Sequence, residues 1–97
     1  MIESFADAGT EDVYNGVDSK AARKCCPHDL WRQARRKLDM LDAAVSLAGL
    51  RFPPGNRLEG LKGDRRGEFS IRINDQYRIC FRWTEAGPRE VAIVDYH

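Results

Sequence analysis

The sequence predicts an α+β domain, with helices in the first half of the chain and a mainly antiparallel sheet in the second. Apolar residues recur at alternating spacings of three and four over residues 29–49, which is typical of an amphipathic helix. Apolar and polar residues alternate strictly over 69–73 and 77–83, which indicates two strands with one buried face each. Pro53-Pro54-Gly55-Asn56 separates the two patterns. Helices followed by a meander of strands are typical of an α+β domain.

The helix over residues 29–49 is the best-defined element. We expect Asp29 to cap its N-terminus and Gly49 to end it. Its buried stripe should consist of Trp31, Ala34, Leu38, Leu41, Val45 and Ala48. Before it, weaker patterns predict a short strand over 1–5 and a short helix that Thr10 caps and Gly16 ends. Whether residues 6–28 are ordered or partly mobile stays open.

Three strand regions are expected after the break. A short strand over 58–61 precedes the hairpin 69–73/77–83, whose turn is Asn74-Asp75-Gln76. The last strand covers 91–96, and its run from Val91 to Val94 does not alternate. We therefore expect a central strand that is covered on both faces. Together with residues 1–5, this makes a sheet of four or five strands.

Length and composition place the chain among small single-domain proteins, with one domain over residues 1–97. No apolar run approaches the ~18 residues of a membrane span, and the first residues do not resemble a secretory signal. We therefore expect a cytoplasmic protein with no membrane partner. The three cysteines, two of them adjacent, favour reduced thiols over disulfides. Cys25-Cys26-Pro27-His28 lacks a second ligand pair at zinc spacing, so no metal is expected.

Charge is distributed unevenly along the chain. The formal net charge is +1, but residues 1–19 hold five acidic and no basic residues. The remaining residues, 20–97, hold sixteen basic and ten acidic residues and carry +6. A basic body is compatible with a polyanionic partner, although scattered Lys and Arg are also common on an ordinary solvated surface.

The hairpin register follows from its two apolar faces. Because these faces must coincide, paired residue numbers sum to about 150, which places Arg72 opposite Arg78 and Glu68 opposite Arg82. Two facing arginines destabilise a sheet unless an anion joins them, and two guanidinium groups suit a phosphodiester. The pattern fits equally well with two surface arginines whose side chains splay apart.

Several polar residues outside the hairpin are candidates for the same site. His97 follows Asp95-Tyr96 and would act as a general acid or base near neutral pH, or would belong to a frayed terminus. Tyr96 would stack on a base or pack in the core. Lys62, in the turn over 61–67, would bind phosphate or be merely exposed. Glu59 taken alone fits a solvated carboxylate.

Three motifs in order resemble a known family. They are Leu-Lys-Gly-Asp-Arg at 61–65, Asn-Asp-Gln-Tyr-Arg-Ile at 74–79 and Asp-Tyr-His at 95–97. Together with Arg36–Ala44 and Pro53–Glu59, they resemble the HigB-type killer toxins of the RelE superfamily, in particular the GraT-like members. The resemblance covers roughly residues 30–97 and includes little of residues 6–28.

This resemblance implies a RelE-like fold, with two N-terminal helices packed on the sheet, and the toxin of a type II toxin–antitoxin system. It implies an endoribonuclease without metal or cofactor that cuts mRNA in the ribosomal A site and inhibits translation and growth. The implied partner is a HigA-like antitoxin with a helix-turn-helix domain, through which alone the toxin would meet operator DNA. A non-cleaving corepressor that binds ribosome or antitoxin is the alternative, and a ribonuclease acting on free RNA is a third possibility.

The resemblance also implies residue roles. Arg78 matches the family arginine of the second hairpin strand, and His97 matches the terminal histidine, the expected acid. Glu59 stands where a HigB relative has histidine and resembles the glutamate base of the YoeB branch, so the base is Glu59 or His97. Arg72 is the fourth expected catalytic residue, because the predicted hairpin register places it opposite Arg78. The expected RNA-binding residues are Lys62, Arg65, Arg82, Asp95 and Tyr96.

Overall fold

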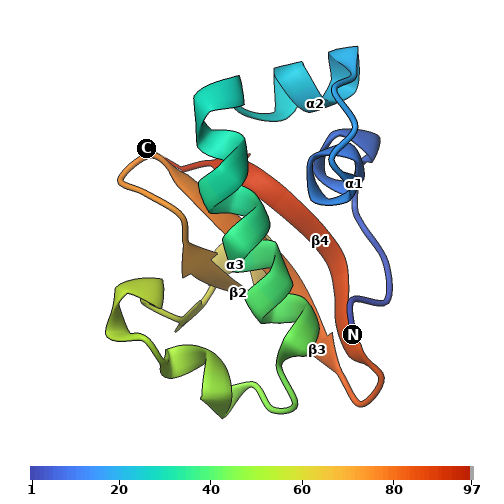
Figure 1. The fold of residues 1–97 in the computed structure, drawn as a ribbon. Coiled ribbons are helices and arrows are strands. Elements are labelled where there is room, and N and C mark those ends of the chain that lie inside the picture. The colour runs from blue at the N-terminus through green and yellow to red at the C-terminus, as the bar shows by residue number, and fades with distance from the viewer. Residues whose placement is uncertain (97) are drawn as a thin grey trace.

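The structure, a computed structural model, describes residues 1–96. Within this range, three α-helices precede a four-stranded antiparallel sheet of order β1-β2-β3-β4. The helices are α1 (Ala8–Asn15), α2 (Lys20–Cys25) and α3 (Trp31–Ala43), and the strands are β1 (Glu59–Gly60), β2 (Glu68–Arg72), β3 (Tyr77–Thr84) and β4 (Gly87–Asp95). Figure 1 shows α3 lying across one face of the sheet, with α1 and α2 beside it. The α+β prediction is confirmed, although three helices form where the resemblance implied two.

The core lies between α3 and the apolar face of the sheet. Trp31, Ala34, Leu38 and Leu41 are buried on α3, as their spacing predicts. They form one cluster with sheet residues that include Ile71, Ile79, Phe81, Val91 and Ile93. Burial of these side chains contributes about 25 cal/mol per Å² of apolar surface and fixes which face of the sheet remains outside.

The predicted ends of this helix are wrong. A 3-10 turn, His28–Leu30, runs directly into α3, so Asp29 lies within that turn and Leu30 occupies the N-cap position. At the other end the helix stops at Ala43, and Val45 is 97% exposed. Asp42 accepts a 2.7 Å hydrogen bond from the backbone N–H of Ile2. The chain then turns away at this point and buries Leu50 instead of continuing the stripe to Val45 and Ala48.

The segment between α3 and β1 is held by one buried amide. Two 3-10 turns, Ala48–Arg51 and Pro54–Asn56, make up this segment, and the Asn56 side chain is fully buried. Its Nδ2 donates to the carbonyl oxygens of Leu50 and Phe52, and its Oδ1 accepts from Lys37 Nζ at 2.5 Å. These bonds tie the irregular segment to α3.

The predicted hairpin register is confirmed. Arg72 pairs with Arg78, and Glu68 pairs with Arg82 across β2 and β3. The expectation of a central last strand is wrong, since β4 is the final strand of the sheet order. Its outer edge is partly paired by the N-terminal segment, where the Val91 N–H donates to the Ser4 carbonyl and Phe5 forms a parallel bridge with Val91. The strand predicted over 1–5 is thus reduced to this single bridge, and the strand over 58–61 to two residues.

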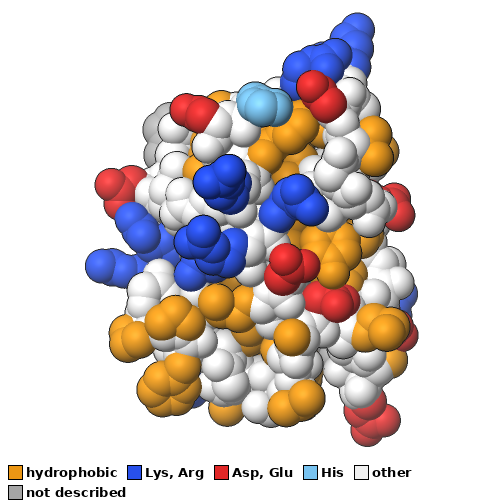
Figure 2. All heavy atoms as spheres, viewed as in Figure 1, with side chains coloured by type: hydrophobic (Ala, Val, Ile, Leu, Met, Phe, Trp, Pro, Cys, Tyr) orange, Lys and Arg blue, Asp and Glu red, His pale blue; other side chains and the backbone are white. Residues whose placement is uncertain are grey.

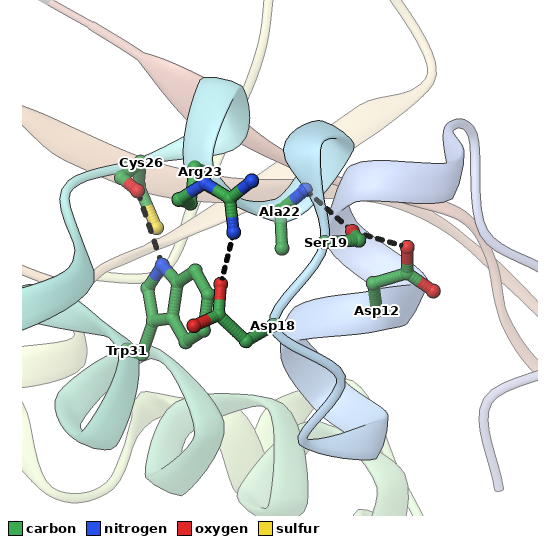
Figure 3. A network of polar contacts seen from close by, with 7 residues as sticks. All are labelled: Asp12, Asp18, Ser19, Ala22, Arg23, Cys26 and Trp31. Carbon is green, nitrogen blue, oxygen red and sulfur yellow. Dashed lines mark hydrogen bonds and ion pairs between the residues drawn. The ribbon is translucent and has the colours of Figure 1, made fainter.

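Polar contacts organise the first thirty residues. Asp7, not Thr10, caps α1, whereas Gly16 ends it in a left-handed conformation as predicted. Ser19 caps α2, a helix that the sequence analysis missed, and also donates to Asp12 (Figure 3). The Trp31 indole N–H donates to the Cys26 carbonyl oxygen in the same network.

The Thr10 hydroxyl is buried and binds β4 instead. Its Oγ1 accepts a 3.0 Å hydrogen bond from the Ile93 N–H. This bond attaches α1 to the sheet at a site where the β4 backbone has no neighbouring strand. None of the helices in residues 1–96 is long and apolar enough to cross a membrane.

Candidate functional site

The candidate site lies on the sheet face opposite α3. Because side chains alternate along a strand, the burial of Ile71, Ile79 and Phe81 under α3 turns Ser70, Arg78 and Cys80 to the other face. The register places Glu59 beside Ser70, and Ser70 beside Cys80. Three strands therefore bring a carboxylate, a hydroxyl and a guanidinium group to one surface.

Arg78 is the centre of this surface. Its Nε donates to Ser70 Oγ at 2.8 Å, and its Nη2 donates to the Arg57 carbonyl oxygen at 2.7 Å. The same Nη2 lies 3.5 Å from Glu59 Oε1, and the guanidinium group lies 5.7 Å from the centre of the Tyr96 ring. The Arg78 side chain is only 12% exposed, whereas the Glu59 side chain is 51% exposed. The cation is thus fixed by neutral acceptors, and the carboxylate remains open to solvent.

The Arg57 backbone adopts an unusual conformation that aims its carbonyl at Arg78. Arg57 follows the 3-10 turn Pro54–Asn56 and has a φ of 47°, in the left-handed region. This conformation costs a non-glycine residue about 1–2 kcal/mol. The buried Asn56 amide immediately before it offsets that cost by anchoring the segment.

Arg72 stands opposite Arg78 but has a partner of its own. Its guanidinium group forms an ion pair with Asp75 in the β2–β3 turn. The repulsion expected between the facing arginines is therefore offset in the described chain by two separate carboxylates, Asp75 and Glu59. The register prediction is confirmed, while a phosphate held between the two guanidinium groups stays a prediction.

The expected RNA-binding residues that precede β4 each have different surroundings. Arg65 forms an ion pair with Glu68 at 3.2 Å, and Arg82 forms one with Glu90 at 2.8 Å. Lys62 is exposed and directly precedes the 3-10 turn Gly63–Arg65.

The two residues at the end of β4 differ in their contacts. Asp95 accepts a 3.1 Å hydrogen bond from Gln76, whereas Tyr96 lies against Arg78. His97, the expected acid, lies outside the described residues.

Two members of the site were missed by the sequence analysis. Ser70 carries a signal, because a register with a sum of 150 already places it diagonally across from Arg78. The Arg57 carbonyl carries none, because backbone acceptors from irregular segments leave no pattern in a sequence.

A buried thiol lies beneath the site. Burial raises the pKa of Cys80, and Glu68 and Glu59 raise it further, while Arg65 and Arg78 lower it.

Further basic side chains lie on the helix side of the molecule. Figure 2, viewed from that side, shows Lys and Arg side chains gathered over α3, with hydrophobic ones over the segment that follows it. Arg32, Arg35 and Arg36 are exposed there. Burial lowers the pKa of Lys37 on the same helix, as do the nearby charges of Arg72 and Arg36.

Comparisons with known proteins show the family and the fold. A family model described as the RelE-like toxin of the type II toxin–antitoxin system HigB matches residues 3–97. Toxin HigB-1 of Vibrio cholerae is 42% identical over 85 residues, which are 88% of this chain and 86% of that protein. An uncharacterised protein of Haemophilus influenzae is 40% identical over 57 residues, which are 59% of this chain and 56% of that protein.

Solved structures show the same fold. The Staphylococcus aureus YoeB–YefM complex contains a chain that superposes with a TM-score of 0.61 at 16% identity, covering 100% of this chain and 98% of that one. The YoeB/ParE toxin of Agrobacterium tumefaciens superposes with a TM-score of 0.51 at 17% identity, covering 99% and 96%. The family match over nearly the whole chain and the identity to HigB-1 have one consequence: this chain belongs to the HigB-like family of RelE-like toxins of type II toxin–antitoxin systems.

Proposed function

We propose that this toxin is a metal-independent endoribonuclease that cuts mRNA in the ribosomal A site and thereby stops translation in the cytoplasm. The observation that carries the proposal is the fixed Arg78 guanidinium beside Glu59 and Tyr96, on a sheet face that α3 leaves uncovered. A cation held in place in this way stabilises charge that develops on a phosphate without reorganising during the reaction.

Each demand of RNA cleavage has a candidate residue. The 2′-hydroxyl must lose a proton as it attacks the adjacent phosphorus, and we assign this step to Glu59, whose carboxylate is exposed beside Arg78. Arg78 neutralises the phosphorane, with Arg72 and Lys62 as further cations. His97 donates a proton to the departing 5′-oxygen, and Tyr96 stacks on a nearby base. Arg65, Arg82 and Asp95 contact the RNA around this centre.

The binding partners follow from the same proposal. Membership of the family implies an antitoxin, and the Staphylococcus aureus relative is in complex with YefM. We infer a HigA-like antitoxin with a helix-turn-helix domain, which would also be the toxin's sole link to operator DNA. Ribosome dependence agrees with a site that holds its central cation in a fixed position but has few groups of its own for proton transfer.

Primer extension on a defined mRNA in a purified translation system tests the proposal. The wild-type protein should make discrete A-site cuts only when ribosomes are present. Arg78→Ala, Glu59→Ala and His97→Ala should each lose most of this cleavage, whereas Arg23→Ala, which removes an exposed ion pair on α2, should cleave like the wild type. Loss of cleavage in only one of Glu59→Ala and His97→Ala would identify the base or acid that is indispensable.

Two other outcomes would contradict the proposal. Translation arrest by the wild-type protein with intact mRNA would indicate the non-cleaving ribosome- or antitoxin-binding regulator. Equal cleavage of naked RNA would indicate a ribonuclease that needs no ribosome.

A further inference from the structure

Two adjacent cysteines at the end of α2, Cys25 and Cys26, have different surroundings. The Cys25 side chain is half-buried, whereas Cys26 is 2% exposed. Cys25 is the last residue of α2, and Cys26 already has an extended backbone, with φ of −161° and ψ of 161°. One thiol of the pair is therefore accessible from solvent, while the other is protected beside it.

The Cys25 thiol lies among hydrogen-bonding groups. Thr10 Oγ1 lies 3.6 Å from Cys25 Sγ, and because this Oγ1 accepts the Ile93 N–H, its own proton remains available to the sulfur. A hydrogen bond with the Cys26 thiol lowers the pKa of Cys25; burial raises it, the Thr10 contact lowers it, and the charge of Asp7 raises it, with a lowered pKa as the net result. These contacts favour the thiolate, which is the nucleophilic form of cysteine.

Close packing of α1 against α2 brings Thr10 to the sulfur. A Cβ at Gly9 would lie 2.6 Å from the Ala21 carbonyl oxygen and 3.0 Å from Cys25 Cβ. A larger residue at position 9 would push the two helices apart, so glycine allows the neighbouring Thr10 to reach Cys25.

The other two thiols are held in the protonated form. The hydrogen bond with Cys25 raises the pKa of Cys26, as do burial and the charges of Cys25 and Asp29. Cys80 in β3 is fully buried, and burial is the main cause of its raised pKa. Of the three cysteines, Cys25 alone combines access to solvent with a lowered pKa, the two properties that make a thiol easy to oxidise.

We propose that Cys25 and Cys26 form an oxidation site, at which a hydroperoxide oxidises Cys25 and Cys26 then closes a disulfide with it. In the first step the Cys25 thiolate attacks one peroxide oxygen, so that an S–O bond forms as the O–O bond breaks. The sulfur is oxidised to a sulfenic acid, and the peroxide is reduced and leaves with a proton as an alcohol, or as water when it is hydrogen peroxide.

The second step uses the protected thiol. The Cys26 sulfur attacks the Cys25 sulfur, the S–S bond forms as the S–O bond breaks, and hydroxide leaves with the Cys26 proton as water. The net change converts two thiols and one hydroperoxide into a disulfide, an alcohol and water. This chemistry is independent of the proposed ribonuclease function.

The disulfide would be easily reversed and would disturb two contacts. Adjacent Cα atoms lie about 3.8 Å apart across a trans peptide, closer than the about 4.4–6.8 Å that is usual for disulfides, so thiols reduce such a bond readily. Ring closure moves the Cys25 sulfur away from Thr10 and turns the Cys26 carbonyl, which accepts the Trp31 indole N–H at 3.1 Å (Figure 3). Oxidation should therefore loosen the junction between α1, α2 and α3.

The test is oxidation of the full-length toxin by hydrogen peroxide, followed by tryptic peptide mapping. Trypsin should release residues 25–32 with both adjacent thiols and residues 79–82 with Cys80, so the two sites are scored separately. We expect the 25–32 peptide to lose two hydrogen atoms, to regain them with dithiothreitol, and to react at least about tenfold faster than Cys80. The melting temperature of the oxidised protein should fall by about 4 °C or more and recover on reduction.

Three variants separate the two steps. Cys26→Ser should stop at the sulfenic acid, which a 1,3-diketone probe traps on Cys25. Cys25→Ser should leave Cys26 reduced. Cys80→Ala is the matched control and should form the disulfide like the wild type. Mapping of the wild-type protein needs no substitution, so the test stays decisive if a variant fails to fold.

Several outcomes would overturn the oxidation site. These are equal rates at all three cysteines, no reaction at a peroxide concentration that oxidises a free peptide of residues 25–32, and a disulfide from Cys25 to Cys80 or to a second molecule. A sulfenic acid that persists on Cys25 of the wild-type protein while Cys26 stays reduced would refute the role assigned to Cys26.

Discussion

The Arg78 guanidinium donates a 2.7 Å hydrogen bond to the Arg57 carbonyl oxygen, 21 residues earlier in the chain. This bond joins a regular strand to an irregular segment, so the position of the central cation depends on both. Ser70 Oγ provides the second acceptor from β2. Arg78 is therefore held from two directions by groups that carry no charge.

Arg78→Lys should abolish most of the activity even though it keeps the charge. An ammonium group lacks the planar arrangement of donors that reaches Ser70 and Arg57 together. We expect cleavage on the ribosome to fall by about a hundredfold or more, as when a fixed donor is removed from a developing negative charge. Arg23→Lys on α2 is the matched control, and equal activity of the two variants would contradict the structural role of the guanidinium group.

Asn56→Asp tests the anchor of the segment that carries Arg57. The substitution removes the Nδ2 donor and places a carboxylate oxygen against the carbonyl oxygens of Leu50 and Phe52, while Lys37 Nζ remains as the partner of the other oxygen. We expect urea unfolding to show a loss of about 2–4 kcal/mol, with cleavage reduced as well because Arg57 is displaced. The same change at the exposed Asn15 should leave both quantities near their wild-type values.

Thr10→Val tests the bond between α1 and β4. Valine has nearly the same shape but leaves the buried Ile93 N–H without its acceptor. The free energy of unfolding should fall by about 1–3 kcal/mol, measured by urea denaturation. Thr10→Ser retains the hydroxyl and should lose less; a larger loss in the serine variant would assign the effect to packing.

The hairpin and most of the core were predictable from the sequence, because both follow from the spacing of apolar residues along short segments of the chain. Strand periodicity of two admits few registers, so the pairing of Arg72 with Arg78 followed from apolar parity alone. The end of α3 was not predictable, because Val45 continues the helical spacing and only the tertiary contact of Asp42 with Ile2 shows where the helix stops. The acceptors of Arg78 were hidden for the same reason, since one of them is a distant backbone carbonyl.

Val45→Ser checks the corrected helix end. Because Val45 is 97% exposed, its replacement should change the free energy of unfolding by no more than about 0.5 kcal/mol. Leu41→Ala, in the same apolar series but fully buried, should cost about 2–5 kcal/mol. Comparable losses of unfolding free energy in the two variants would instead indicate that the helix continues to Val45.

Stability at alkaline pH should depend on Cys80. Burial raises the pKa of this thiol above its ordinary value of 9.0, so the unfolded chain releases the proton at a lower pH than the folded protein. The resulting stabilisation is complete below pH 9 and is lost as pH rises from there through the folded-state pKa. Cys80→Ala should therefore reduce the alkaline slope of the unfolding free energy by up to about 1.4 kcal/mol per pH unit. Identical slopes in the two proteins would exclude a raised pKa at Cys80.

The position of β4 affects the order in which the toxin can be assembled during its own synthesis. This strand follows every other helix and strand in the described chain, yet it pairs with β3 and with Phe5, and its Ile93 N–H donates to the Thr10 hydroxyl oxygen. Until it leaves the ribosome, the far edge of β3 has no partner and Tyr96 cannot reach Arg78. A nascent chain therefore carries an open sheet edge, which invites aggregation, and an unfinished site. Under the proposed function, the site around Arg78 therefore becomes complete only after β4 has paired with β3 and Tyr96 has reached Arg78.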